Sequence, residues 1–303
     1  MFLVVTPWVG VRSQGACAAP IRAILNGHTR NWTQIYLAAL TVDSTGVRMG
    51  AAARLTTRPG YNHQPAFTPD GRGMYYTWRA DSAEADIWFH DLSNGTEYPV
   101  TCTSEDEYSA APVPGGSDIS VVRVENDSVR RLWIVDGANR SLRVLFPSLR
   151  TVAYYAWMDA VTIALYVTSD SAPGGSSLGI GDVRSGSVRI VASGIGSTLA
   201  KLPTQDAISY LDIRDPVHPR LMELDARSHV SRFIVALPDA ASDYTWLPDH
   251  SILASVGQRI FRWTERSRTW VEIADLRNSS VGDIRRFVAS PGGDHLAIVV
   301  QTH

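Results

Sequence analysis

The chain has 303 residues, 45% of them hydrophobic, and a formal net charge of -2. This composition supports a large core and excludes a disordered chain, and the near-zero charge gives no basis for binding nucleic acid or an anionic membrane. Asp, Gly and Pro are abundant beside 9 Trp and 11 Tyr, which favours strands and turns over helices. No apolar stretch is long enough for a transmembrane helix.

The first 30 residues partly resemble an export signal. A short apolar run precedes Ala16-Cys17-Ala18, a cleavage-like site, but Pro7 interrupts the run and no basic residue precedes it. We expect residues 1–30 to be a leader and residues 31–303 to be one domain. The protein would then be periplasmic or secreted, and otherwise cytoplasmic. Because Cys17 lies in the leader, we expect no bridge to Cys102, which we predict to be a small residue on a strand.

A turn motif recurs along the rest of the chain. Its best copy is Phe67–Gly71, and related turns follow apolar runs at four further prolines, with a proline-free copy near Met158. These prolines are Pro114, Pro203, Pro248 and Pro291. The spacing is about 44 residues, a period typical of propellers and solenoids.

Alternating apolar residues flank each turn, which predicts a strand, a tight turn and a second strand. Two further apolar runs complete most repeats, so that one repeat predicts a four-stranded propeller blade. The repeat at Pro291 ends after two strands, whereas the N-terminal runs 34–38 and 47–56 look like the missing third and fourth strands. We therefore predict an all-β, six-bladed β-propeller of four-stranded antiparallel blades, with the ring closed by N-terminal strands joining the C-terminal blade.

The segment from Gln64 to Trp88 resembles the WD40-like repeat of TolB-type propellers. That pattern is roughly P-x-[FW]-[ST]-P-D-G, a strand, and then D-I-[YW], and it is matched here by Pro65, 67–71 and 86–88. The turn at Pro291 is a second match, and the other copies are degraded. The resemblance covers nearly all of the chain after residue 30. It implies a propeller that is periplasmic and acts in binding and assembly.

The first strand of each blade lines the central channel of a propeller, so residues near the start of these strands gather at one mouth. Alignment on the turns places polar residues from all six repeats there: Asn62, His63, Gln64, Glu107, Tyr108, Ser109, Tyr154, Tyr155, Thr198, Ser242, Asp243, Tyr244, Arg285 and Arg286. We expect Tyr108, Tyr155, Tyr244 and Arg285 to bind a small-molecule, peptide or protein ligand. Neighbouring residues of a strand point to opposite faces, so only one of the two arginines faces the channel.

A calcium-dependent propeller hydrolase acting on esters, lactones or phosphotriesters is the alternative. Asn62, Glu107 and Asp243 would supply oxygen ligands to calcium or another divalent metal, and His63 would be the general base. The metal would polarise the substrate oxygen and orient the attack. The sequence lacks the motifs of such hydrolase families. A third possibility is a polypeptide- or sugar-binding surface protein that uses Arg285 and Arg286 to bind carboxylates, which suit the arginine fork. At this point all three functions stay open.

Overall fold

The computed structural model describes residues 32–43, 46–80, 84–125, 127–137, 142–170, 172–225, 227–241, 243–279 and 281–301. The predicted leader, residues 1–30, lies outside this part of the chain, and the proposed domain boundary stays a prediction. Within the described residues, all regular structure is β-strand apart from one short 3-10 helix, η1 (Pro173–Gly175). None of the described segments is a helix of the length and apolarity needed to cross a membrane.

Four sheets each contain four antiparallel strands that follow one another along the chain. One consists of β8 (Asp106–Pro112), β9 (Ile119–Val124), β10 (Arg130–Val135) and β11 (Leu142–Val144). The next consists of β12 (Val152–Trp157), β13 (Thr162–Thr168), β14 (Ser176–Asp182) and β15 (Ser187–Ser193). The third consists of β16 (Ile195–Lys201), β17 (Ala207–Asp212), β18 (Arg220–Asp225) and β19 (Ser231–Ala236). The fourth consists of β20 (Asp243–Trp246), β21 (Ile252–Val256), β22 (Arg259–Trp263) and β23 (Val271–Asp275).

The remaining strands form one larger sheet that brings the two ends of the chain together. Its members are β4 (Tyr61–Phe67), β5 (Gly73–Arg79), β6 (Asp86–Asp91), β7 (Glu97–Pro99), β24 (Ile284–Ala289), β25 (His295–Gln301), β1 (Thr33–Asp43), β2 (Gly46–Met49) and β3 (Ala53–Arg54). Strand β1 pairs antiparallel with β25 over seven residues, from Thr33–Gln301 to Ala39–His295. A single parallel pair, Thr33–Tyr61, connects this part to β4.

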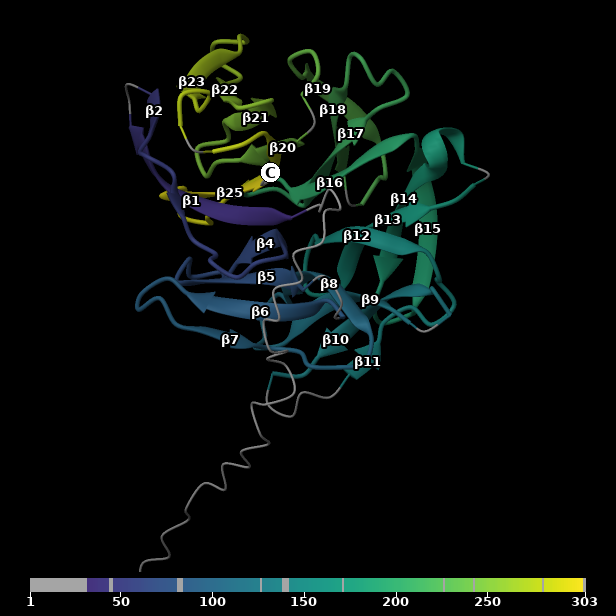
Figure 1. Cartoon of the computed structure of the whole chain (residues 1–303). Helices are drawn as coiled ribbons and strands as arrows, with labels where there is room; N and C mark the ends of the chain where they lie inside the picture. Colours follow the sequence, from purple (N-terminus) through teal and green to yellow (C-terminus); the bar gives the residue numbers. More distant parts are fainter. Residues whose placement is uncertain are drawn as a thin grey trace, which may run out of the picture.

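The sheets are arranged around a common centre, and the strands of each sheet follow one another outward (Figure 1). Strands β4, β8, β12, β16 and β20 lie near this centre, whereas β7, β11, β15, β19 and β23 lie at the periphery. Every predicted turn falls between the first and second strand of its repeat, including the copy at Met158, between β12 and β13, that lacks proline. The predicted all-β fold, with several four-stranded antiparallel sheets, is confirmed.

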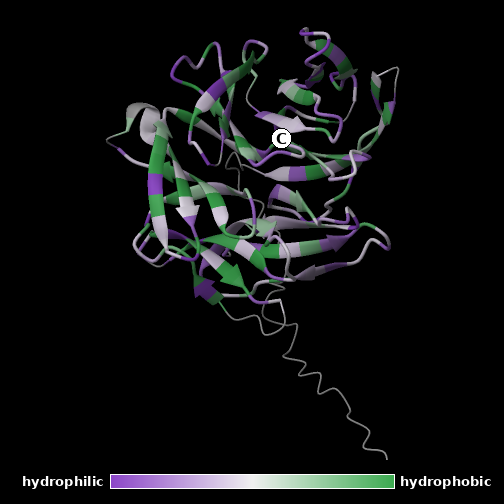
Figure 2. Ribbon diagram, turned by 180° about the vertical axis from the view of Figure 1, so that it is seen from behind, coloured by the Kyte–Doolittle hydropathy of each residue, from purple (hydrophilic) through white to green (hydrophobic). Residues whose placement is uncertain are grey.

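The core is divided among clusters that lie between neighbouring sheets, and strand β25 shows why. Successive side chains of a strand point to opposite faces. Ile298 and Val300 pack with Leu253 and Ile260 of the sheet β20–β23. Ala297 and Val299 pack instead against Met74, on the sheet that starts at β4. Both faces of this strand are buried, which explains its continuous apolar run. Figure 2 shows hydrophobic residues concentrated along the strands in the same way.

Cys102 differs from its prediction. It lies in the loop between β7 and β8, is exposed, and is disulfide-bonded. Both parts of the prediction are therefore wrong: residue 102 lies in a loop and not on a strand, and its thiol is in a disulfide. The other cysteine of the sequence, Cys17, lies outside the described residues.

Candidate functional site: the central cavity

Irregular pairing shapes the strands nearest the centre. The register shifts within β4, β8, β12, β16 and β24, whereas β20 pairs with β21 without a shift. A β-bulge bends a strand and changes the direction of its side chains. At two of these bulges the backbone of Gln64 and of Ser109 adopts a positive φ of 54°. The bulges therefore decide which polar side chains reach the centre.

A cavity of about 350 Å³ lies where these strands meet. Residues of β4, β8, β12, β16, β20 and β24 line it, so every repeat contributes its first strand. Among the described residues of this lining, tyrosines apart, the ionisable side chains are Asp243 and Arg286. This arrangement is a concave site with few charges, as expected for a ligand pocket.

Asp243 is 2% exposed and is held by donors from three strands. Its Oδ1 accepts hydrogen bonds from Thr198 Oγ1 and from the backbone N of Tyr244, and its Oδ2 accepts one from the backbone N of Phe287 at 2.9 Å. Burial raises the pKa of this carboxyl, whereas the Arg286 guanidinium and the hydrogen bonds oppose the rise. Asp243 thus stabilises the junction of β16, β20 and β24.

The environment of Arg286 differs from that of Asp243, because it provides close neighbours but no hydrogen bond. Its Nε lies 4.0 Å from Asp243 Oδ2, and its Cζ lies 4.8 Å from the centre of the Tyr154 ring. Its side chain is 18% exposed, yet its guanidinium donates no hydrogen bond to any residue that the structure describes. The neighbouring Arg285 donates to Gln301 Oε1 at 2.7 Å on the exposed side. The structure thus places Arg286 at the cavity, rather than the predicted Arg285.

Further aromatic and basic side chains gather beside Arg286. The Tyr61 ring stacks on His63 at 5.0 Å between centres and meets the Tyr108 ring edge-on at 6.5 Å. Arg79 donates to the Tyr108 hydroxyl at 3.3 Å. Burial raises the pKa of Tyr61, and Tyr154, Tyr108, Arg286 and Arg79 also influence it, so these charges and rings are close neighbours.

His63 is a weak base in this setting. Burial lowers its pKa to about 3, and the Arg286 charge adds to the effect. Its Nδ1 is buried without a partner among the described residues. The imidazole is therefore neutral near pH 7, and its role as a general base stays a prediction.

Tyr155 and Tyr244 line the cavity, but their hydroxyl groups serve the junctions between sheets. Tyr155 donates to Ser120 Oγ at 2.8 Å, and Tyr244 donates to Ser209 Oγ at 2.9 Å. A tryptophan two residues later donates to the same serine in both cases, at 2.8 Å. Only the rings of the two tyrosines remain for the predicted contact with a ligand.

The three predicted metal ligands lie at different places. Asn62 Nδ2 donates to backbone carbonyls of Thr33 and Arg58, which leaves its Oδ1 buried without a described partner. Glu107 is fully buried at the junction of β6, β8 and β9, and Asp243 lies at the cavity. No cluster of three or more His, Cys, Asp or Glu side chains suits a metal ion in the part of the chain with described positions. The three predicted ligands therefore do not surround one common point. Calcium stays a prediction that no contact between these residues supports.

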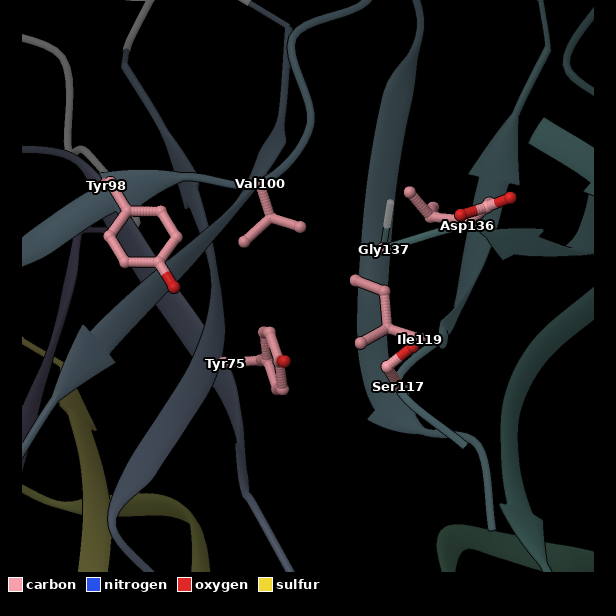
Figure 3. Close-up of a pocket in the computed structure, with 8 residues that line it drawn as sticks. Tyr75, Tyr98, Val100, Ser117, Ile119, Asp136 and Gly137 are labelled. Atoms are coloured by element: carbon pink, nitrogen blue, oxygen red, sulfur yellow. The ribbon is translucent and has the colours of Figure 1, made fainter. Parts of the chain in front are cut away.

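A second cavity, of about 370 Å³, lies towards the periphery (Figure 3). Tyr75, Tyr98 and Val100 face Ile119 across it, with Ser117, Asp136 and Gly137 on the far side. It separates the sheet containing β5 and β7 from the sheet β8–β11. It has a mainly apolar lining and no cluster of ionisable groups.

The sequence prediction named part of the central site and missed Tyr61 and Arg79. Tyr61 lies two residues before His63 and so shares its face of β4, a signal that strand alternation could have supplied. Arg79 pairs with Tyr61 across β4 and β5. That pairing depends on the bulge in β4, which the sequence pattern did not indicate.

Comparisons with solved structures agree with this architecture. A structure assigned as TolB from Agrobacterium tumefaciens has a TM-score of 0.68 at 12% identity, over 89% of this chain and 99% of that chain. TolB from Acinetobacter baumannii has a TM-score of 0.57 at 13% identity, over 89% of this chain and 64% of that chain. A structure of a nidogen/laminin complex has a TM-score of 0.60 at 13% identity, over 79% of this chain and 92% of that chain. No protein-family model matches the sequence, and no curated protein matches it. At these identities the likeness concerns the fold, which is a TolB-like β-propeller.

Proposed function

We propose that this TolB-like propeller is a closed ring of six blades that binds a peptide, or an exposed segment of a partner protein, at the mouth of its central cavity. The larger sheet would supply two blades, β4–β7 and the set of β24, β25, β1 and β2–β3. The seven-residue pairing of β1 with β25 supports this closure. The described residues also form six hydrophobic clusters, each shared by two successive sets of strands, including the pair at the chain ends.

One observation carries the binding function: the first strand of every repeat contributes to a single cavity, and its wall keeps polar groups without a hydrogen-bond partner among the described residues. Arg286 is one, and the buried Ser109 Oγ is another among the described residues. Buried polar groups without partners are costly in a folded protein, so a ligand that pairs with them gains free energy. Binding and assembly are also the functions that the TolB resemblance implies.

The periplasm, or the exterior of the cell, is the proposed location. The structural likeness to TolB proteins of two bacteria supports it. The disulfide at the exposed Cys102 also suits an oxidising compartment.

A display selection tests the function. A library of random 12-residue peptides, a length of about 40 Å when extended, is selected on the wild-type protein and then measured on two variants. Ser197→Trp fills the cavity from its β16 wall, whereas Ser187→Trp places the same side chain on the exposed outer strand β15. We expect peptides that bind wild type and Ser187→Trp but not Ser197→Trp. If every selected peptide binds the three proteins alike, the central cavity is not the binding site.

A further inference from the structure

Among the described polar groups of the cavity, the guanidinium of Arg286 has the most hydrogen-bond donors. It offers five N–H donors in a planar fork and always carries its charge. Its side chain is 18% exposed and its guanidinium has no hydrogen bond to a described residue. The Arg286 nitrogens are not among the fully buried atoms, so they are open to the cavity and can donate to a ligand there.

Asp243 does not satisfy that need. Its two oxygens already accept hydrogen bonds from Thr198, Tyr244 and Phe287, and the nearest Arg286 nitrogen is 4.0 Å away. At that distance the two groups attract each other without forming a hydrogen bond. Arg286 therefore stays near Asp243 while its donors remain available to a ligand in the cavity.

The charge balance of the cavity favours a carboxylate over a phosphate as the bound anion. Arg286 and Asp243 are one basic and one acidic group, and the other described residues of the lining are neutral. A phosphate dianion would bring two negative charges close to Asp243, whereas a carboxylate brings one. A carboxylate also matches the fork of a guanidinium with two parallel hydrogen bonds.

The wall beside Arg286 can pack against an apolar or aromatic side chain next to that carboxylate. The Tyr154 ring lies 4.8 Å from the guanidinium carbon, and Phe287 and Tyr155 belong to the same lining. Aromatic rings stack on other rings and on planar groups. Ser109, from β8, is a further polar residue of the lining, and its Oγ has no hydrogen-bond partner among the described residues.

We propose that the cavity recognises a carboxylate of its peptide ligand through Arg286, with an aromatic or apolar residue next to that carboxylate. The inference rests on the proposed peptide-binding function and adds the chemistry of the ligand. The carboxylate can be the C-terminus of a chain or the side chain of an acidic residue.

Four small probes test this proposal by isothermal titration calorimetry. N-acetyl-tryptophan and its amide differ only in a C-terminal carboxylate, and acetyl-Trp-Glu-amide and acetyl-Trp-Gln-amide differ only in a side-chain carboxylate. We expect the acid of at least one pair to bind wild type about tenfold more tightly than its amide partner, the effect of one charged hydrogen-bonded contact. The pair that shows the difference identifies the source of the carboxylate.

Arg286→Gln and Arg285→Gln form a matched pair of variants, because the two arginines are neighbours and only Arg286 lines the cavity. We expect Arg286→Gln to abolish the preference for the acid and Arg285→Gln to keep it, with circular dichroism confirming that both variants fold. Equal binding of acid and amide by wild type, or no binding by any probe up to its solubility, overturns the proposal without using a variant.

The two proposals can fail separately. Displayed peptides that Ser197→Trp blocks, but whose binding does not change in Arg286→Gln, would keep the peptide-binding function and refute the role of Arg286. A selection without any cavity-dependent peptide would refute the function itself.

Discussion

Replacing Glu107 by glutamine should remove a large part of the pH dependence of stability. Glu107 is fully buried, and its Oε1 accepts a hydrogen bond from Thr103 Oγ1 at 2.6 Å. Its Oε2 is buried without a partner among the described residues, and Arg123 Nε is 3.6 Å from Oε1. Burial therefore raises the pKa of Glu107 from 4.5 to about 7, although the Thr103 hydrogen bond and Arg123 oppose the rise.

The sign and the size of the effect follow from proton linkage. Between pH 4.5 and about 7 the folded protein holds a proton on Glu107 that the unfolded chain has released. The free energy of unfolding therefore falls as the pH rises through this window. A shift of this size corresponds to about 3 kcal/mol, at about 1.4 kcal/mol for each pKa unit. Asp86, whose pKa burial raises to about 6, titrates in the same range and steepens the fall.

Urea denaturation at about pH 5 and about pH 8 measures this effect. Wild type should lose stability between the two values, and Glu107→Gln should lose about 2–3 kcal/mol less, since this interval covers most of the shift. The control is Glu272→Gln, on the exposed face of β23, which should follow wild type. If wild type and Glu107→Gln lose the same free energy between the two pH values, Glu107 is not a buried, protonated group and the reasoning fails.

Three further substitutions test the packing between sheets by urea denaturation. Ser209→Ala removes the acceptor of two aromatic donors and should cost about 1–3 kcal/mol; an unchanged midpoint would show that water replaces it. Gly181→Ala would place a Cβ 2.6 Å from the Phe146 ring and should cost about 1–3 kcal/mol; a neutral effect would mean that the ring can move. Ile35→Ala, on the fully buried part of β1, should cost about 2–5 kcal/mol; a small loss would argue against closure by this strand.

The sequence was sufficient for the turns and for the number of strands in each repeat. Proline and glycine restrict the backbone in ways that tight turns require, and Gly71, with a φ of 71°, is an example. Period-two alternation then identifies the strands on either side of each turn. The copy at Met158 could be placed without its proline because the flanking strands repeat at the same spacing.

The choice of Arg286 over Arg285 could not be made from the sequence. Alternation says that one of the two faces the cavity, and a β-bulge decides which one. In β24 the pairing with β25 passes from Ile284–Val300 directly to Arg286–Val299, so Arg285 is the additional residue of the bulge. A bulge depends on contacts with a neighbouring strand, which a local sequence pattern does not contain. The alignment on the turns also placed Gln64 and Ser109 at the mouth, and both line the cavity, but the bulges at these two residues were not predicted.

The roles of the tyrosines follow from a recurring contact that is also absent from local patterns. Ser120 and Ser209 occupy equivalent positions in two sheets, and each accepts hydrogen bonds from a tyrosine and a tryptophan of the following sheet. At these two junctions the polar groups of the wall are satisfied within the protein. Arg286 and Ser109 belong to other junctions, and neither the Arg286 guanidinium nor Ser109 Oγ has a hydrogen-bond partner among the described residues. Because a ligand gains most from groups that the fold leaves unpaired, the binding free energy should be concentrated on the β24 and β8 sides of the cavity.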